Sequence, residues 1–382
     1  MTLSPTRWLS LFYIHFFLGW GIYLPFWSLW LKGQSLTPAL IGILLGVAQG
    51  TRAMGSLFIT TRIRRSEQLM PAARLLSLAT LVLFCGFLLP QSLPLLLGLT
   101  LISSLLYSPL MPISDAIATR MVAQIGIDYG KVRLWGSVAF VVMSTLMGYF
   151  TGLWGSQAVL WCLLVTQMMM FLGTLPAMSV PLTDGAAAKA STPWLELLKL
   201  PKLRRFLFTN MAIQGSHAAY YGFSAIYWQS LGISAGTIGF LWSWGVVVEV
   251  AVFFFAKRLF GNKRASWLLS IAACAVMLRW SGTAFASSLW QLVLLQAMHG
   301  LTFTLAHLGA ITYISKELPR HHGVGTQALY SALALSLSVA AMMLVTGGLF
   351  EALGGKVFLV MAALGLPALL LARKVRPIEE PA

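Results

Sequence analysis

The chain contains 382 residues, of which 58% are hydrophobic and only 9% are charged, whereas an ordinary soluble domain has roughly 25% charged residues. A mean hydropathy of +0.81 excludes a soluble globular fold and predicts that most of the chain lies in lipid. At roughly 20 residues for each span, about twelve helices fill this length, which leaves no room for a soluble catalytic domain. The net charge of +16 has no basic domain to carry it, so we expect no nucleic-acid partner.

Apolar stretches long enough to cross a bilayer follow one another along the whole chain. Short turn segments such as Pro90-Gln91 and Gly354-Gly355 separate them. Because a helix satisfies its own backbone hydrogen bonds in lipid, each stretch predicts one transmembrane helix. We therefore expect an all-α membrane protein with twelve helices, at about residues 8–31, 38–61, 71–89, 93–118, 132–152, 157–180, 204–231, 236–258, 265–285, 289–315, 324–349 and 355–372.

The basic residues predict how these helices are oriented. With the N-terminus placed inside, 22 of the 26 lysines and arginines fall in inside segments, and only Lys32 and Lys356 fall in outside loops. Arg52 and Arg279 remain within spans. Cytoplasmic loops carry such an excess of basic residues, so we expect both termini in the cytoplasm. An odd number of spans would break the alternation, so the charge pattern also favours twelve.

The middle of the chain differs from the other connections. Residues 181–203 are polar and rich in small residues, and then become amphipathic. On either side the sequence repeats weakly, because residues 26–30 (FWSLW) recur as residues 223–227 (FSAIY) at an offset of 197. This pattern is typical of transporters with two parallel six-helix halves. We expect an N-terminal half at 1–180, a cytoplasmic linker at 181–203 and a C-terminal half at 204–382.

Three stretches carry a resemblance to a known family: residues 24–33 (LPFWSLWLKG), 128–140 (DYGKVRLWGSVAF) and 217–229 (HAAYYGFSAIYWQ). Through them the whole chain resembles the major facilitator superfamily, and within it the phenylpropionate permease family, which is related to nucleoside and oligosaccharide proton symporters. The resemblance implies two pseudo-symmetric six-helix halves and a monomer in the bacterial inner (plasma) membrane. One departure is the loop at 55–65 (GSLFITTRIRR), which lacks the superfamily's acidic residue.

Charged residues well inside the spans are the first candidates for function, because a charge in lipid is costly. At about 1.5 Å per residue, Glu249 lies about 20 Å below the outer surface, His299 about 15 Å and Arg279 about 10 Å. A chain of contacts in that order fits, and the oligosaccharide symporters use these residue types in helices 8, 10 and 9 for proton coupling. We predict proton coupling at these three residues, with a structural ion pair of Glu249 as the alternative. Those relatives have a second glutamate one turn after the histidine, where this chain has Thr302.

Arg52 has no acidic residue within a turn on its own helix. Because an arginine fork matches a carboxylate, we predict that it binds a substrate carboxylate; pairing with backbone carbonyls or a distant acid is the alternative. Asp115 and Arg133 are expected near the cytoplasmic interface, where a pair between them would gate the inner mouth. Asp128, just before Arg133 in the chain, is grouped with them as a gating residue.

Aromatic side chains at helical spacing supply a second substrate signal. Trp20, Tyr23 and Trp27 follow i, i+3 and i+7 in the first span, and a similar series begins at His217 in the seventh. Interfacial belts also use tryptophan and tyrosine, but the residues of the seventh span are expected deeper. A polar and aromatic stripe in the tenth span adds two more candidates. With Arg52, the predicted substrate-binding residues are Tyr23, Trp27, His217, Tyr220, Tyr221, Gln296 and His307.

The predicted function is secondary active transport by alternating access. Aromatic walls with a few buried cations suit a small aromatic carboxylate. The resemblance implies proton-coupled import of one of the 3-phenylpropionate or cinnamate type; a nucleoside or sugar proton symporter and a drug efflux pump are the alternatives. We expect no enzyme, metal site or cofactor, because the sequence has no metalloprotease motif and no phosphate-binding loop for ATP. The expected partners are the substrate, protons and the lipid bilayer.

Overall fold

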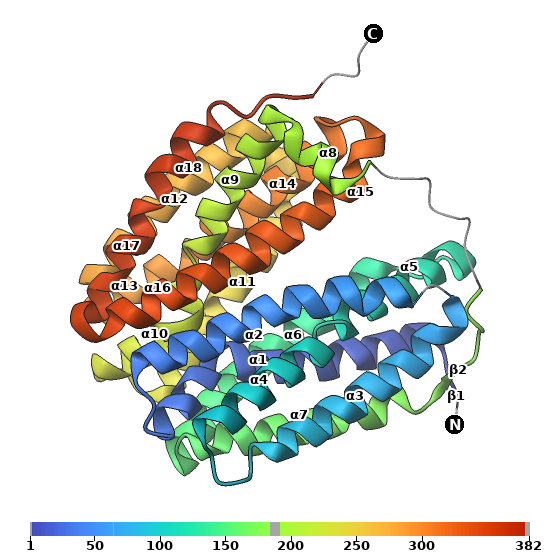
Figure 1. Ribbon diagram of the computed structural model, residues 1–382, viewed down its shortest axis with the longest axis horizontal. Helices are drawn as coiled ribbons and strands as arrows, with labels where there is room; N and C mark the ends of the chain where they lie inside the picture. The colour runs from blue at the N-terminus through green and yellow to red at the C-terminus, as the bar shows by residue number, and fades with distance from the viewer. Residues whose placement is uncertain (1, 64, 184–191, 379–382) are drawn as a thin grey trace. The chain divides into compact units, whose positions relative to one another are not determined.

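The computed structural model describes residues 2–63, 65–183 and 192–378, which form helices and two short strands (Figure 1). Strand β1 (Thr2–Leu3) pairs in parallel with β2 (Ala177–Met178), so the two ends of the first half meet. The helices between them are α1 (Pro5–Gly33), α2 (Pro38–Phe58), the 3-10 helices η1 (Thr60–Arg62) and η2 (Ser66–Gln68), α3 (Leu69–Gly86), α4 (Leu93–Tyr107), α5 (Leu110–Ile125), α6 (Tyr129–Trp154) and α7 (Gln157–Thr174).

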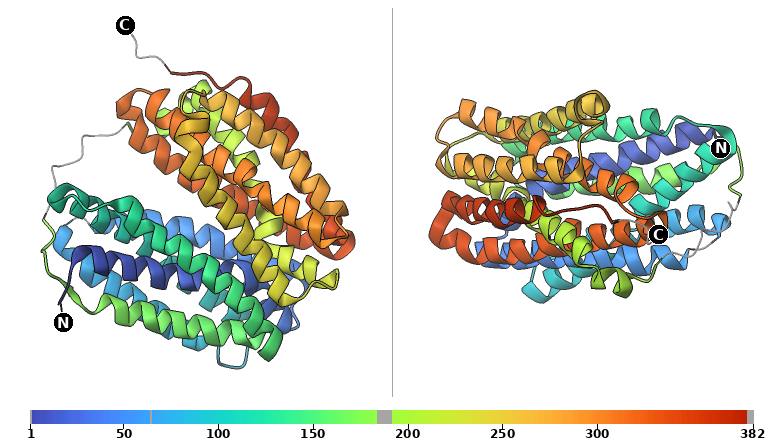
Figure 2. Two further views of the ribbon diagram at one scale, coloured as in Figure 1. Left: turned by 180° about the vertical axis from the view of Figure 1, so that it is seen from behind. Right: turned by 90° about the horizontal axis from the view of Figure 1, so that it is seen from above.

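The second half of the chain is also helical, and its helices lie side by side in a bundle (Figure 2). Two of its segments, η3 and η4, are π-helices. The elements are α8 (Trp194–Lys199), α9 (Pro201–Gly215), α10 (Ala218–Ser230), α11 (Ala235–Phe260), α12 (Ala265–Phe285), α13 (Leu289–Ala297), η3 (Gly300–Thr304), α14 (Leu305–Lys316), α15 (Arg320–Leu329), η4 (Tyr330–Leu337), α16 (Ser338–Leu353), the 3-10 helix η5 (Gly354–Lys356), α17 (Val357–Ala363) and α18 (Gly365–Ala372).

Ten stretches of the described chain are long and apolar enough to cross a membrane. One of them, 52 residues from His321 to Ala372, covers α15 to α18, which the sequence predicts as two spans. The predicted span 204–231 is not among the ten, because it is divided into α9 with 15 residues and α10 with 13. Each of the twelve predicted spans therefore corresponds to one helix or to consecutive helices, and the all-α prediction is confirmed.

The described residues divide into two compact units. Unit 1 contains residues 2–37, 47–183 and 232–243, and unit 2 contains residues 38–46, 192–231 and 244–378. The first residues of α2, 38–46, belong to unit 2, whereas the rest of α2 belongs to unit 1. The first residues of α11, 235–243, belong to unit 1, whereas the rest of α11 belongs to unit 2. Of the predicted linker at 181–203, residues 184–191 lie outside the described residues, and α8 forms within the remainder.

Small residues allow the long helix α1 to pack closely inside unit 1. It lies against α6 and α7 over much of its length (Figure 1). A Cβ atom added at Gly21 would lie only 2.8 Å from the carbonyl oxygen of Phe140 on α6, so any side chain there would force the two helices apart. Because Gly21 has no side chain, α1 can lie close to α6, and this close packing sets the distance between the aromatic residues of α1 and that helix.

Three places in unit 2 depart from regular α-helix. Ser216 and His217 lie between α9 and α10, where the seventh span is broken. The π-helix η3 begins directly after His299, and the π-helix η4 begins at Tyr330. Such π segments are rare and often occur at functional sites, because they change the direction of side chains locally. These three irregular places therefore mark the part of unit 2 where a functional site is expected.

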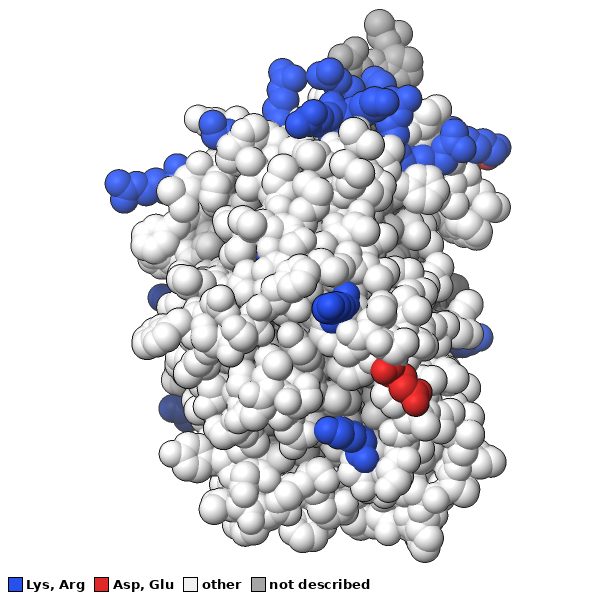
Figure 3. All heavy atoms as spheres, turned by 90° about the vertical axis from the view of Figure 1, so that its left-hand side faces the viewer, with Lys and Arg blue, Asp and Glu red and all other residues white. Residues whose placement is uncertain are grey.

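Charged side chains are sparse on much of the surface. On the face shown in Figure 3, most of the lysine and arginine side chains lie along the top of the view, and only a few scattered charged side chains lie below them. Large apolar side chains such as Phe254, Leu278 and Trp290 are exposed. A surface of this kind is suited to contact with lipid.

Candidate functional site

Arg279, on α12, lies at the centre of a buried polar cluster in unit 2. Its Nη1 donates to Nδ1 of His299 at 3.0 Å and to Oγ1 of Thr302 at 2.9 Å. Its Nη2 donates to Oε1 of Gln296 at 2.9 Å. Together with Glu249, which contacts His299, these residues are called the Arg279 cluster.

The hydrogen bonds of His299 determine where its proton lies. A guanidinium only donates, so Nδ1 of His299 accepts from Arg279 and the single ring proton is on Nε2. Nε2 lies 3.3 Å from Oε2 of Glu249, to which it donates. A second proton on the ring would place an N–H group against the guanidinium. In this conformation His299 therefore links Glu249 to Arg279 as a neutral imidazole.

Thr302 extends the cluster to the break between α9 and α10. Nδ1 of His217 lies 3.0 Å from the carbonyl oxygen of Ile213, so that nitrogen carries the proton. Nε2 of His217 then accepts from the Thr302 hydroxyl at 3.1 Å, and the same oxygen accepts from Arg279. A hydroxyl stays neutral at physiological pH. Thr302 therefore holds Arg279 without adding a second carboxylate to the cluster.

Aromatic rings cover the Arg279 guanidinium. Its Cζ lies 4.8 Å from the ring centroid of Tyr220 and 4.2 Å from that of Trp280. The indole N–H of Trp280 is fixed in turn by the Ser216 hydroxyl, at 3.0 Å. Arg279 thus donates to three neutral acceptors and packs against two rings, while its buried Nε, like that of Arg52, has no hydrogen-bond partner within the described ranges. Its bond to His299, which contacts Glu249, favours a role in coupling.

The two remaining predicted substrate residues of unit 2 lie beside the cluster. Tyr221 stacks on His217, with 5.7 Å between ring centroids. His307 lies two turns beyond His299 on α14, where its Nδ1 is 3.2 Å from the hydroxyl of Tyr330 and its ring stacks on Phe303. Of the unit 2 residues predicted to bind substrate, Gln296 accepts a hydrogen bond from Arg279 and the ring of Tyr220 covers its guanidinium. His307 lies further along the chain, next to Tyr330.

Arg52, on α2, has different surroundings in unit 1. Its Cζ lies 4.3 Å from the ring centroid of Trp20 and 4.6 Å from that of Tyr23. Its Nη1 is 3.5 Å from Oε1 of Gln49, at the outer limit for a hydrogen bond, and its buried Nε has no hydrogen-bond partner within the described ranges. None of the ion pairs in the described part of the chain includes Arg52. Arg52 therefore has more N–H groups left to donate to a ligand than Arg279, which already makes three side-chain hydrogen bonds.

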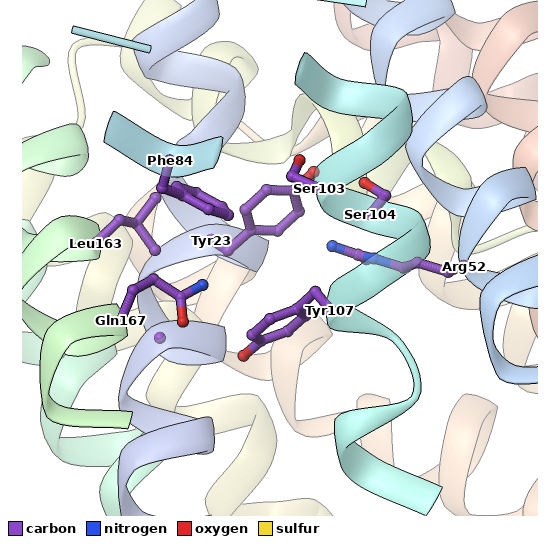
Figure 4. A pocket seen from close by; sticks show the side chains of 9 residues that line it. Tyr23, Arg52, Phe84, Ser103, Ser104, Tyr107, Leu163 and Gln167 are labelled. Carbon is purple, nitrogen blue, oxygen red and sulfur yellow. The ribbon is translucent and has the colours of Figure 1, made fainter. Parts of the chain in front are cut away.

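Arg52 lines a pocket within unit 1, called the Arg52 pocket here (Figure 4). Tyr23 and Tyr107 lie between Arg52 on one side and Gln167 on the other. The pocket has a cavity volume of about 10 Å³, which is close to the minimum that holds a single water molecule. An aromatic ring could enter only if the side chains around it separated. The other lining residues are Gly19, Phe84, Ser103, Ser104 and Leu163.

Sequence reasoning identifies only two of these lining residues, Arg52 and Tyr23. Trp27 is not one of them, because it is buried and stacks on a neighbouring tryptophan with 4.5 Å between centroids. Tyr107 and Gln167 are missed, although a glutamine within the apolar span 157–180 is a signal that the sequence does contain. Such a residue is costly in lipid unless it faces a polar partner or a cavity.

Asp115 and Arg133 do not form the expected ion pair. Oδ1 of Asp115 accepts from the hydroxyl of Tyr13 at 2.6 Å and from that of Tyr129 at 3.1 Å. The Arg133 guanidinium stacks instead over Phe17, with Cζ 4.2 Å from the ring centroid. No ion pair among the described residues joins the two, so the prediction of a pair is wrong. Tyrosine hydroxyls from α1 and α6 satisfy the carboxylate in place of the arginine.

Asp128 caps the N-terminus of α6. Its Oδ1 accepts from the backbone N–H of Lys131 at 3.1 Å, and its Oδ2 is 3.4 Å from the Lys131 ammonium. The backbone N–H, and then the lysine charge, lower the pKa of Asp128 from its ordinary value, so it stays ionised at physiological pH. A carboxylate at this place is favourable because it satisfies an unpaired N–H group of the first turn. The contacts of Asp128 are thus those of a helix cap.

The repeat relates the two sites. Its offset of 197 residues relates Tyr23 to Tyr220 and Arg52 to Glu249. Equivalent positions therefore carry a cation beside a small pocket in unit 1 and an anion within a hydrogen-bonded cluster in unit 2. No group of three His, Cys, Asp or Glu side chains that could hold a metal ion occurs in the described ranges.

Comparisons with known proteins identify the family. The model of the MFS_1 like family matches residues 6–360. The chain is 41% identical over 378 residues to the "Probable 3-phenylpropionic acid transporter" of Escherichia coli (strain K12), with 99% of this chain and 100% of that protein covered. It is 27% identical to the "Maltose permease" of Geobacillus stearothermophilus, with 89% and 86% covered. The crystal structure of the nucleoside transporter NupG has a TM-score of 0.78 at 15% identity, covering 98% of this chain and 99% of that one. The fold is that of the major facilitator superfamily, and the chain belongs to its MFS_1 like family.

Proposed function

We propose that this protein imports a small aromatic carboxylate, of the 3-phenylpropionate or cinnamate type, together with protons. The observation that carries the proposal is the Arg52 pocket, where a guanidinium that has no acidic partner among the described residues lies among aromatic rings. A planar guanidinium can bind a carboxylate through two parallel hydrogen bonds, and the rings offer apolar surface to a phenyl group. The name of the 41% identical relative supports the same substrate class.

The Arg279 cluster is proposed as the site of proton coupling. Glu249 is the carboxylate of the cluster, and its side chain is 22% exposed, whereas that of His299 is 7% exposed. When Glu249 takes up a proton it loses the charge that the His299 N–H stabilises. The net charge of the Arg279 cluster then becomes more positive, and a change of charge of this kind can shift the equilibrium between two conformations of a transporter. Coupling therefore depends on a carboxylate at this position.

The substrate class can be tested by uptake into proteoliposomes from a panel of labelled compounds. The panel contains 3-phenylpropionate, cinnamate, a nucleoside and maltose. We expect uptake of the two aromatic acids above that of protein-free liposomes, and no uptake of the other two. Transport of maltose or the nucleoside in place of the acids would reject the aromatic carboxylate and favour a sugar or nucleoside symporter.

Asp115 is proposed to influence the inner gate through its tyrosine contacts rather than through an arginine. Asp115→Asn weakens the hydrogen bonds from Tyr13 and Tyr129, which join α1, α5 and α6. Because bonds to a charged acceptor contribute roughly 1.5–3 kcal/mol, we expect exchange rates to change by about tenfold or more. The ranking of substrates should stay as in the wild type. Exchange assays with two aromatic acids measure both the exchange rates and the ranking of substrates. A change in the ranking without a change in the rates would contradict a role of Asp115 in the inner gate.

The topology is proposed from the distribution of charge. The excess of basic residues in alternate loops supports cytoplasmic N- and C-termini in a bacterial inner membrane. Proteolysis of tags at either end in sealed right-side-out vesicles should occur only after the vesicles are opened; cleavage in sealed vesicles would reverse the assignment. We also propose that the protein acts as a monomer without a cofactor, because one chain supplies all the residues of the Arg52 pocket and of the Arg279 cluster.

A further inference from the structure

Gln167, on α7, is a buried polar side chain for which the proposed function gives no role. It is 4% exposed, and its amide forms no hydrogen bond to any residue in the described part of the chain. The neighbouring Thr166 differs, because its hydroxyl donates to the backbone carbonyl of Leu163 at 2.9 Å. A buried amide without partners is unfavourable, so a protein normally supplies a partner for it. At this place the partner has to come from the Arg52 pocket.

The side chain points into that pocket from the side opposite to Arg52. Figure 4 shows Arg52 and Gln167 facing each other, with the rings of Tyr23 and Tyr107 between them on either side. When the side chains around the pocket separate to admit a ring, a ligand with its carboxylate at Arg52 and its ring between the tyrosines has the far edge of the ring next to Gln167. An amide offers both a donor and an acceptor there. A hydroxyl group on the ring, which also donates and accepts, matches both.

We propose that Gln167 is a specificity-determining residue that selects aromatic carboxylates with a hydroxyl group on the ring, at the meta or para position. The inference rests on the proposed function, since it requires that the carboxylate binds at Arg52. It adds that the unsubstituted acid is not the preferred ligand. An ortho hydroxyl lies beside the propionate chain, so it is too near Arg52 to reach Gln167.

The test is a set of dissociation constants for purified protein, measured by calorimetry. The ligands are 3-phenylpropionate and its 2-, 3- and 4-hydroxyphenyl derivatives. For the wild type we expect the 3- or 4-hydroxy acid to bind roughly 3- to 10-fold more tightly than 3-phenylpropionate, which is the range of one neutral hydrogen bond. The 2-hydroxy acid should bind like 3-phenylpropionate. Gln167→Leu should remove the preference, so that the 3- and 4-hydroxy acids bind no more tightly to the variant than 3-phenylpropionate does.

Thr166→Val is the matched control, because Thr166 lies on the same helix and does not line the pocket; it should keep the wild-type preference. Gln167→Met gives a second variant of similar length in case the leucine variant does not fold. Equal binding of all four acids by the wild type, or a preference that survives in a Gln167 variant, would overturn the inference and leave the proposed function intact. If the wild type binds none of the four acids, both are rejected.

Discussion

Glu249→Gln is expected to abolish accumulation of substrate driven by a pH gradient while leaving exchange of substrate across the membrane. Glutamine keeps the shape of the side chain and an oxygen that can accept from Nε2 of His299, so the contact at 3.3 Å can persist. It removes the group that takes up and releases the proton. Exchange of labelled for unlabelled substrate does not require the carrier to return empty, and so does not require proton release.

Two assays on the same proteoliposomes measure this prediction. With an imposed gradient, accumulation by Glu249→Gln should fall to the level of protein-free liposomes, whereas counterflow should remain within about threefold of the wild type. Glu351→Gln, on the exposed side of α16, is the matched control and should behave like the wild type in both assays. Accumulation by Glu249→Gln at wild-type levels would show that this glutamate has only a structural role.

Arg52→Gln is expected to remove the preference of the protein for an acid over its neutral amide. If the guanidinium binds the carboxylate, its loss removes about 1.5–3 kcal/mol of charge-assisted hydrogen bonding, which is roughly a 10- to 150-fold loss of affinity. The amide should lose far less, because it carries no charge. Arg52→Lys keeps the charge without the planar fork, and should recover only part of the affinity for the acid.

The comparison of Arg52 with Arg279 makes this prediction specific. Arg279 already donates to His299, Thr302 and Gln296, so Arg279→Gln should impair coupling but keep the ratio of acid to amide affinity. Arg258→Gln, at the exposed end of α11, controls for the loss of one positive charge. Binding of 3-phenylpropionate and 3-phenylpropionamide to the wild type and the four variants measures the ratio. Loss of the preference in Arg279→Gln rather than Arg52→Gln would exchange the two roles.

The helices could be predicted from the sequence because hydropathy and length are local properties. The predicted span 204–231 illustrates the limit of this reasoning. Its composition indicates one helix, but the structure breaks it at Ser216 and His217, whose side chains bond to Trp280 and Thr302 on other helices. A break that is stabilised by partners from elsewhere in the chain leaves no mark on hydropathy. The π-helices η3 and η4 were likewise outside the reach of the sequence pattern.

Depth along a helix carried the interpretation of the Arg279 cluster. The rise per residue predicts the order Glu249, His299, Arg279, and these residues contact each other in that order. The same arithmetic failed for Asp115 and Arg133, because depth does not say which way a side chain points around its helix. Arg133 turns to Phe17, and the tyrosine hydroxyls reach Asp115 first.

The Arg52 pocket could be recognised only in part, because its lining residues come from five different helices, α1, α2, α3, α4 and α7. Arg52 stood out as a charge in a span, and Tyr23 as part of an aromatic series. Tyr107 and Gln167 come from α4 and α7, and neither has a pattern on its own helix that points to α2. Their contribution depends on how the helices pack around Gly19, which lines the same pocket.

The measurement that tests the central claim most directly is uptake of labelled 3-phenylpropionate into proteoliposomes with an alkaline interior. The protonated acid also crosses lipid unaided, so protein-free liposomes and Glu249→Gln proteoliposomes are measured under the same gradient. We predict initial uptake by the wild type well above both, and a fall to their level when an uncoupler removes the gradient. Wild-type uptake that equals that of protein-free liposomes, or that is unchanged without the gradient, would contradict proton-coupled import of an aromatic carboxylate.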